Sequence, residues 1–107
     1  MPILTQGPDP NPKTPRLKAP PGACDTHIHL FGPVEKYPFA PNSPYTSREA
    51  LPETFIALQE RLGLARAVIV SPGGYSRDYR MLADTLERFP DRFRGIALMP
   101  DDAGASE

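Results

Sequence analysis

The stretch ACDTHIHLFG, residues 23–32, contains the only two histidines of the chain, His27 and His29. Apolar and polar side chains alternate along residues 23–30, and this alternation predicts a β-strand. Side chains two positions apart on a strand point to the same face, so both imidazoles are expected on one side. Two neutral imidazoles on one face can bind a divalent cation. The alternative interpretation is two half-exposed polar residues at a strand end.

The position of the pair along this strand favours a functional site. A Gly-Pro pair at residues 32–33 ends the strand, so the histidines lie near its C-terminal end. Parallel α/β folds build their sites at that end. Strict alternation places Asp25 on the histidine face and Cys24 on the opposite face.

Downstream patterns predict a parallel α/β sheet. Apolar residues at helical spacing predict a helix over 51–62, whose stripe is interpreted as core, and a second helix over 76–89 with Ser76 as its N-cap. Apolar runs at 65–70 and 93–99 predict two further strands, the first of them buried on both faces. Strands alternating with helices indicate parallel pairing with right-handed crossovers.

The fold class expected is therefore α/β, with about three βα units. Three strands leave sheet edges unpaired and one face poorly covered. Residues 100–107 contain acidic side chains suited to the first turn of another helix. We therefore expect the chain to be the front part of a longer protein.

The chain divides into a leader, residues 1–21, and a domain, residues 22–107. Seven of the 15 prolines fall in residues 1–22, which predicts an extended or disordered leader. Residues 31–50 form a long proline-containing loop whose aromatic side chains either cover a site or pack to seal the fold.

Composition excludes several classes of protein. The formal net charge of −1 gives no electrostatic reason to expect a nucleic acid or a membrane surface as partner. No apolar run approaches the ~18 residues of a membrane span. With one cysteine no internal disulfide can form, which fits a cytoplasmic location. The oligomeric state stays open.

The turn over residues 71–76 borders the same end of the sheet as the histidines. Gly73 and Gly74 allow close approach of the backbone to a ligand, and a following helix N-terminus would favour an anion such as a carboxylate. An ordinary βα turn is the alternative interpretation.

These segments together resemble a known family. CDTHIHLFG at residues 24–32 is similar to the first-strand signature of the amidohydrolase superfamily. More narrowly, it resembles the amidohydrolase-related group that includes 2-pyrone-4,6-dicarboxylate hydrolase and related lactone hydrolases. The likeness continues through YPFAP at 37–41, PYT at 44–46, LGLARAVIV at 62–70 and RGIA at 94–97.

The resemblance implies the N-terminal portion of a (β/α)8 TIM barrel that opens at the C-terminal ends of its strands. It implies that His27 and His29 face the active site and that Tyr45 and Ser71 contact the substrate. Many relatives bind one divalent metal, most often zinc, through the histidine pair and later residues. In the pyrone-dicarboxylate branch hydrolysis is metal-independent, so the resemblance leaves the cofactor open.

The function expected is hydrolysis of a small carboxylated lactone or related cyclic ester in a catabolic pathway. His27 and His29 would bind metal or polarise the carbonyl, and this segment alone would be inactive. Two alternatives stay open. One is a non-catalytic α/β module that binds a metal or a small acid, and the other is a lactone isomerase on the same scaffold.

Overall fold

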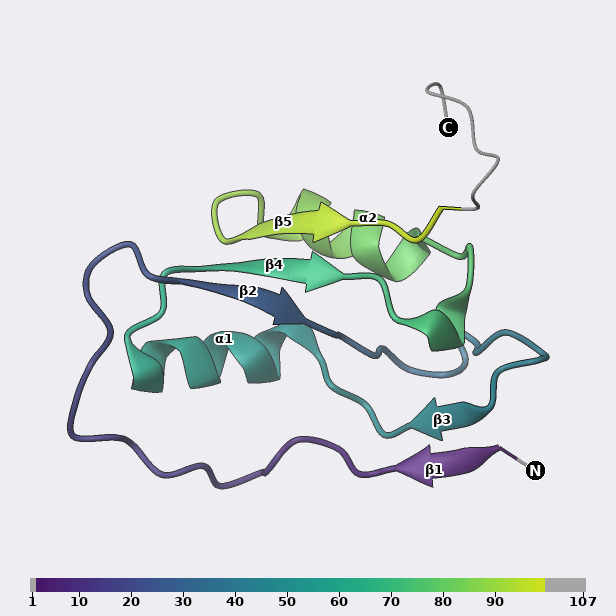
Figure 1. Cartoon of the computed structure of the whole chain (residues 1–107), viewed down its shortest axis with the longest axis horizontal. Coiled ribbons are helices and arrows are strands. Elements are labelled where there is room, and N and C mark those ends of the chain that lie inside the picture. The colour runs from purple at the N-terminus through teal and green to yellow at the C-terminus, as the bar shows by residue number, and fades with distance from the viewer. Residues whose placement is uncertain (1, 100–107) are drawn as a thin grey trace.

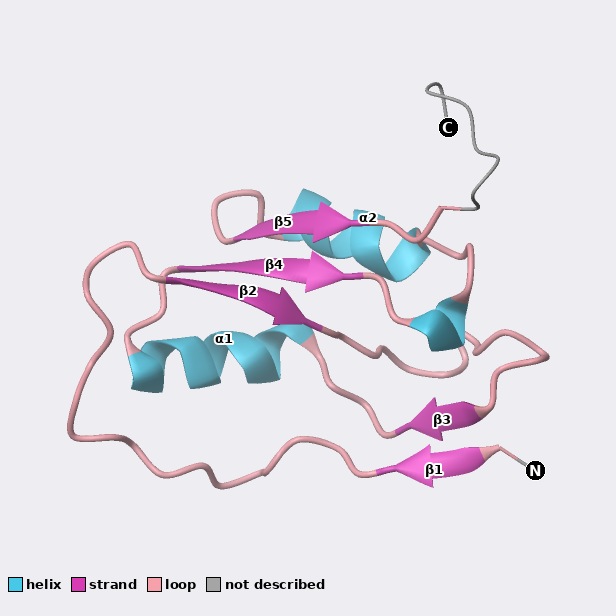
Figure 2. Ribbon diagram, viewed as in Figure 1, coloured by secondary structure: helices cyan, strands magenta, loops and turns pink. Residues whose placement is uncertain are grey.

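The computed structural model of the chain describes residues 2–99, which form two parallel sheets and two α-helices (Figures 1 and 2). In chain order the elements are β1 (Ile3–Thr5), β2 (Cys24–Ile28), β3 (Tyr45–Ser47), α1 (Pro52–Leu62), β4 (Arg66–Val70), the single-turn 3-10 helix η1 (Gly73–Tyr75), α2 (Arg80–Arg88) and β5 (Phe93–Ile96).

The main sheet has the strand order β2-β4-β5, and all its pairs are parallel, as the alternation of strands and helices predicted. The apolar run forms the central strand β4, where Ala67 and Ile69 are 1% and 2% exposed. Strands β2 and β5 come out shorter than the predicted spans 23–30 and 93–99. The acidic segment at 100–107, expected to begin a helix, lies outside the described residues.

Both helices cover the same face of this sheet. Phe93 of β5 is 1% exposed, and its ring lies 6.2 Å from that of Phe55 on α1 and 6.1 Å from that of Phe89 after α2. Burial of such a ring contributes roughly 1.5–3 kcal/mol. On the opposite face, Arg94 and Ile96 are exposed in the part of the chain that the structure describes. The predicted uncovered face is therefore present.

Helix α1 begins and ends as the sequence indicated. Pro52 is its first residue, where a missing N–H costs no helical hydrogen bond, and Glu53 lies in the first turn. Gly63 ends the helix with φ 75°, a conformation that glycine adopts without strain. Among residues 2–99 no helix is long and apolar enough to cross a membrane.

The predicted start of the second helix is wrong. Helix α2 begins at Arg80, and Ser76 ends the preceding turn η1 with φ 52°. Residues 73–75 form η1 first, and four residues, 76–79, then connect this turn to the helix. Asp78 supplies the acceptor at this end, because its Oδ1 accepts a hydrogen bond from the Arg80 N–H at 3.1 Å.

The proline-rich leader is extended, and it is attached to the domain. It runs along the bottom of Figure 1, past α1, and its strand β1 pairs in parallel with β3. The N–H of Ala19 donates to the Leu62 carbonyl at 3.0 Å. The pattern of prolines gave no sign of β1 or β3. The division at residue 21 stays a prediction.

Tyr37 ties the 31–50 loop to α2. The residue is 7% exposed, its hydroxyl donates to the carboxylate of Asp84, and Gly32 lies against the ring. Burial, with help from Asp84, raises the pKa of the Tyr37 hydroxyl above its ordinary value.

We expect Gly32→Ala to destabilise the protein. The new methyl group would lie 2.9 Å from Cε2 of Tyr37 and 3.1 Å from Sδ of Met81, two buried side chains. Such overpacking costs about 1–3 kcal/mol of unfolding free energy, measurable by urea denaturation. Gly73→Ala is the matched control, because a Cβ there meets nothing within 4 Å. Equal stability of the two variants would contradict the packing described.

Candidate functional site

The side chains of β2 divide between the core and the open face of the sheet. Ile28 and Leu30 are buried at 9% and 3% exposure, whereas His27 and His29 are exposed. The prediction that both imidazoles share one face, opposite the apolar residues, is confirmed for these four positions. The core side contacts the helices, so the histidines lie on the uncovered face of the sheet.

The start of β2 does not follow the predicted faces. Asp25 lies level with Ala67, which is buried on the core side, and Cys24 lies level with Arg66, which is exposed. Asp25 was expected on the histidine face and Cys24 opposite, so both assignments are wrong. The pairing register shifts between Asp25 and Ile28, because β2 has one residue more than β4 over this stretch. The extra residue reverses the alternation of side chains between the two faces.

The two imidazole rings lie close together at the C-terminal end of β2. Their centroids are 5.1 Å apart and the ring planes are nearly perpendicular, at 89°. Nδ1 of His29 lies 2.8 Å from the carbonyl oxygen of Val70 on β4. A carbonyl oxygen only accepts hydrogen bonds, so this contact requires the proton on Nδ1. The lone pair of neutral His29 is then on Nε2.

This arrangement fits part of a metal site. Metal-binding histidines usually donate their second ring N–H to a carboxylate or a backbone carbonyl, as His29 does to Val70. A catalytic zinc site needs three protein ligands. Within residues 2–99, however, no cluster of three histidine, cysteine or acidic side chains could hold a metal ion. His27 and His29 can therefore supply two ligands of a larger set.

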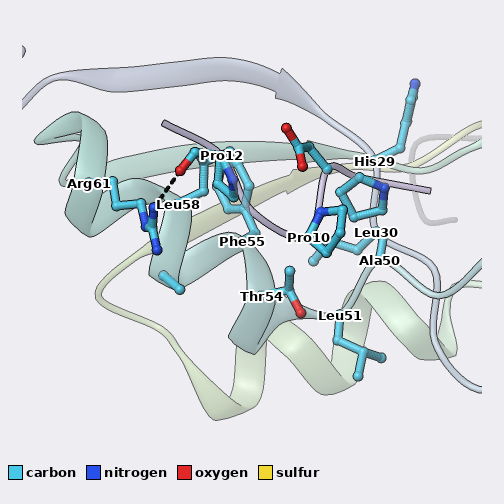
Figure 3. A pocket seen from close by; sticks show the side chains of 13 residues that line it. Pro10, Pro12, His29, Leu30, Ala50, Leu51, Thr54, Phe55, Leu58 and Arg61 are labelled. Carbon is cyan, nitrogen blue, oxygen red and sulfur yellow. Dashed lines mark hydrogen bonds between the residues drawn. The ribbon is translucent and has the colours of Figure 1, made fainter. Parts of the chain in front are cut away.

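A cavity of about 230 Å³ adjoins His29 (Figure 3). Pro10 and Pro12 of the leader form one wall, and Phe55 and Leu58 of α1 form another. The α1 stripe, interpreted as core, thus also lines this cavity. Sequence reasoning missed the leader's part in it, because an extended proline-rich segment has no periodic pattern to reveal which residues make contact.

Aromatic side chains hold the 31–50 loop against the turn after β4. Phe39 stacks on Phe31 and on Tyr75, with ring centroids 5.8 and 5.4 Å apart. The Tyr45 hydroxyl accepts a hydrogen bond from the Gly74 N–H at 3.0 Å, and the Tyr75 hydroxyl accepts one from the Gly32 N–H at 3.1 Å. The aromatic side chains of this loop were expected either to cover a site or to pack and seal the fold. Phe39 and the buried Tyr37 pack against the fold.

Ser71 lies on the core side. It is 3% exposed and lines a small space together with Leu30 and Met81, while its N–H donates to the Ile96 carbonyl at 2.8 Å. It directly follows Val70, whose carbonyl contacts His29. Ser71 is therefore the sequence neighbour of a residue that contacts His29, but its own side chain lies on the other face of the sheet.

The turn after β4 does not lead into a helix N-terminus as expected. Five residues separate Gly74 from Arg80, where α2 begins, and the carboxylate of Asp78 already accepts the Arg80 N–H. Arg80 in turn holds the pKa of Asp78 below its ordinary value through their hydrogen bonds. Of the two interpretations of this turn, the geometry favours the ordinary βα connection, because the helix N-terminus does not adjoin Gly74.

Known proteins match the chain closely enough to place it. The sequence profile described as Amidohydrolase (Amidohydro_2) matches residues 24–107. The chain is 39% identical over 87 residues to 2-pyrone-4,6-dicarboxylate hydrolase of Comamonas testosteroni, covering 81% of this chain and 28% of that protein. It is 43% identical over 77 residues to 4-sulfomuconolactone hydrolase of Rhizobium radiobacter, covering 72% of this chain and 26% of that protein.

A solved structure shares the fold. A probable 2-pyrone-4,6-dicarboxylic acid hydrolase of Acinetobacter baumannii, with citric acid bound, superimposes with a TM-score of 0.69 at 23% identity. The match covers 78% of this chain and 31% of that structure. The parallel α/β arrangement is therefore an N-terminal part of a TIM-barrel fold, as predicted. The chain spans between a quarter and a third of the length of these relatives.

The tautomer of His29 tests this geometry. We expect neutral His29 to carry its proton on Nδ1, because the carbonyl of Val70 accepts it. Long-range ¹H–¹⁵N correlation spectra of the imidazoles report which nitrogen is protonated, and His27 provides the internal comparison. A His29 signal typical of a proton on Nε2 would contradict the contact.

Proposed function

The chain belongs to the amidohydrolase family, and we propose that the protein hydrolyses a small carboxylated lactone through His27 and His29. The observation that carries the proposal is the pair itself: two imidazoles 5.1 Å apart on the open face of a parallel sheet, one of them anchored to Val70. The names of the two curated relatives described above, both lactone hydrolases, support this substrate class.

The two histidines would act on the lactone carbonyl. Protonated His29 keeps Nδ1–H on the Val70 carbonyl and can donate Nε2–H to the carbonyl oxygen of the substrate, which stabilises the charge that develops there. His27, with its ring next to that of His29, can donate to the same oxygen or orient the attacking water. Water adds to the carbonyl carbon, the ring C–O bond breaks, and a hydroxy acid is released.

A divalent metal is the second way to activate the carbonyl. The family generally uses one. Nε2 of neutral His29 together with a ring nitrogen of His27 would hold the metal, and zinc is the ion we propose. When bound, such a metal polarises a carbonyl or lowers the pKa of a water molecule. The two routes differ in pH dependence, because hydrogen-bond donation needs protonated imidazole and metal binding needs neutral imidazole.

We also propose Tyr45 and Ser71 as residues that orient the substrate. The Tyr45 hydroxyl accepts a hydrogen bond from Gly74 and can still donate its own hydrogen to a substrate carboxylate. The buried side chain of Ser71 faces Met81, so a contact with substrate requires the turn after β4 to move.

The single cysteine, Cys24, supports a reducing location such as the cytoplasm.

Hydrolysis of 2-pyrone-4,6-dicarboxylate and of a muconolactone by the complete protein tests the proposal. Product analysis by mass spectrometry distinguishes addition of water from isomerisation, which leaves the mass unchanged. We expect His27→Ala and His29→Ala each to lower kcat/KM by about 10²–10³-fold, the usual effect of losing a group that stabilises the transition state.

Glu87→Ala, on the exposed side of α2, is the control and should keep full activity. Assays with and without a chelator, across pH, separate the metal route from the hydrogen-bonding route. Full activity of both histidine variants, or no turnover of any carboxylated lactone, would refute the proposal.

A further inference from the structure

Strand β2 contains one residue more than β4, its partner, over the stretch in which the two strands pair. Asp25 lies level with Ala67, and Ile28 lies level with Ile69, so three steps on β2 match two steps on β4. Thr26 and His27 together oppose Val68 alone. Such a bulge is rare between parallel strands, and bulges often occur beside active sites, where they redirect a side chain.

Given the pairing of Asp25 with Ala67, the extra residue decides which face of the sheet the imidazoles reach. Asp25 shares the core side with Ala67, so strict alternation from Asp25 would carry His27 and His29 to that side too. Two imidazoles would then be desolvated against the helices, at a cost in free energy. With the bulge, Ile28 and Leu30 enter the core and the histidines reach the open face.

The side chain of Asp25 stabilises this irregular segment. Its Oδ1 accepts a hydrogen bond from the backbone N–H of His27 at 3.2 Å. Aspartate two residues before an N–H commonly forms this local bond, and a residue outside the regular ladder needs such an acceptor. Within residues 2–99 the structure gives the Asp25 carboxylate no other hydrogen bond or ion pair.

We propose that Asp25 is a positioning residue: its hydrogen bond to the His27 N–H holds the bulge that turns the imidazoles of His27 and His29 outward and together. The inference rests on the proposed function only in taking this pair as the reactive group. Asp25 acts through the backbone and touches no substrate. What matters is the position of its acceptor oxygen rather than its charge.

Two conservative variants separate acceptor position from charge. Asp25→Asn keeps an oxygen at the same place without the charge, and Asp25→Glu keeps the charge but moves the oxygen by one methylene. Asp78→Ala is the matched control, because Oδ1 of Asp78 makes the same kind of bond to the Arg80 N–H, away from the histidines.

The chain with labelled histidine allows a direct readout. His27 and His29 are the only histidines of residues 1–107, so within this segment the ring-to-ring nuclear Overhauser effect and the amide exchange of His27 can be assigned. In Asp25→Glu we expect the ring contact to disappear and exchange of the His27 amide to rise about tenfold, the effect of losing one hydrogen bond. Asp25→Asn and Asp78→Ala should keep both within about twofold of the unmodified protein.

The inference is overturned if Asp25→Glu keeps the ring contact and the slow amide exchange, or if Asp25→Asn loses them. Neither measurement needs a lactone or a metal. A protein that shows these changes but hydrolyses no lactone would refute the proposed function alone. A hydrolase whose histidine pair is unaffected by Asp25→Glu would refute only the role of Asp25.

Discussion

The parallel pairing of β2 with β4, including its one-residue shift, is the constraint on which the rest of the structure depends. Pairing with the buried strand β4 brings Ile28 level with Ile69 and so completes the apolar surface that both helices cover. The shift then decides which side chains of β2 join that surface. With Asp25 level with Ala67, an unshifted register would carry both histidines to the core side, whereas the shift lets β2 bury Ile28 and Leu30 and present the histidines to the open face.

The same pairing connects the core to the chemistry of the site. Because β4 lies beside β2, the carbonyl of Val70 reaches Nδ1 of His29 and leaves Nε2 free for a substrate or a metal. The loop that follows β2 returns through the aromatic contacts of Tyr45 and Tyr75, which fasten it to the turn after β4. Backbone groups and aromatic side chains therefore set the geometry around the histidines.

The parts of the fold that depend on periodic burial could be predicted from the sequence. The stripe over 51–62 predicted α1, the apolar run at 65–70 predicted β4, and alternation placed His27 and His29 opposite Ile28. The faces of Cys24 and Asp25 could not be predicted, because a bulge leaves no mark in a hydrophobic pattern. Pairing of β1 with β3 also depends on backbone hydrogen bonds between segments 41 residues or more apart, which local sequence does not encode.

The sequence indicates the histidine pair but not the surroundings in which the structure places it. A His-x-His pair at a strand end is visible in the sequence, whereas the cavity beside His29 arises from the leader and α1 together. The start of α2 at Arg80 places the helix N-terminus away from Gly73 and Gly74, so the interpretation of that turn as an anion site loses its helix. Scalar couplings across the hydrogen bonds between β2 and β4 test the account most directly, because they report the pairing of each N–H with its acceptor. The account predicts a one-residue shift between Asp25 and Ile28; an unbroken register along the two strands would contradict it.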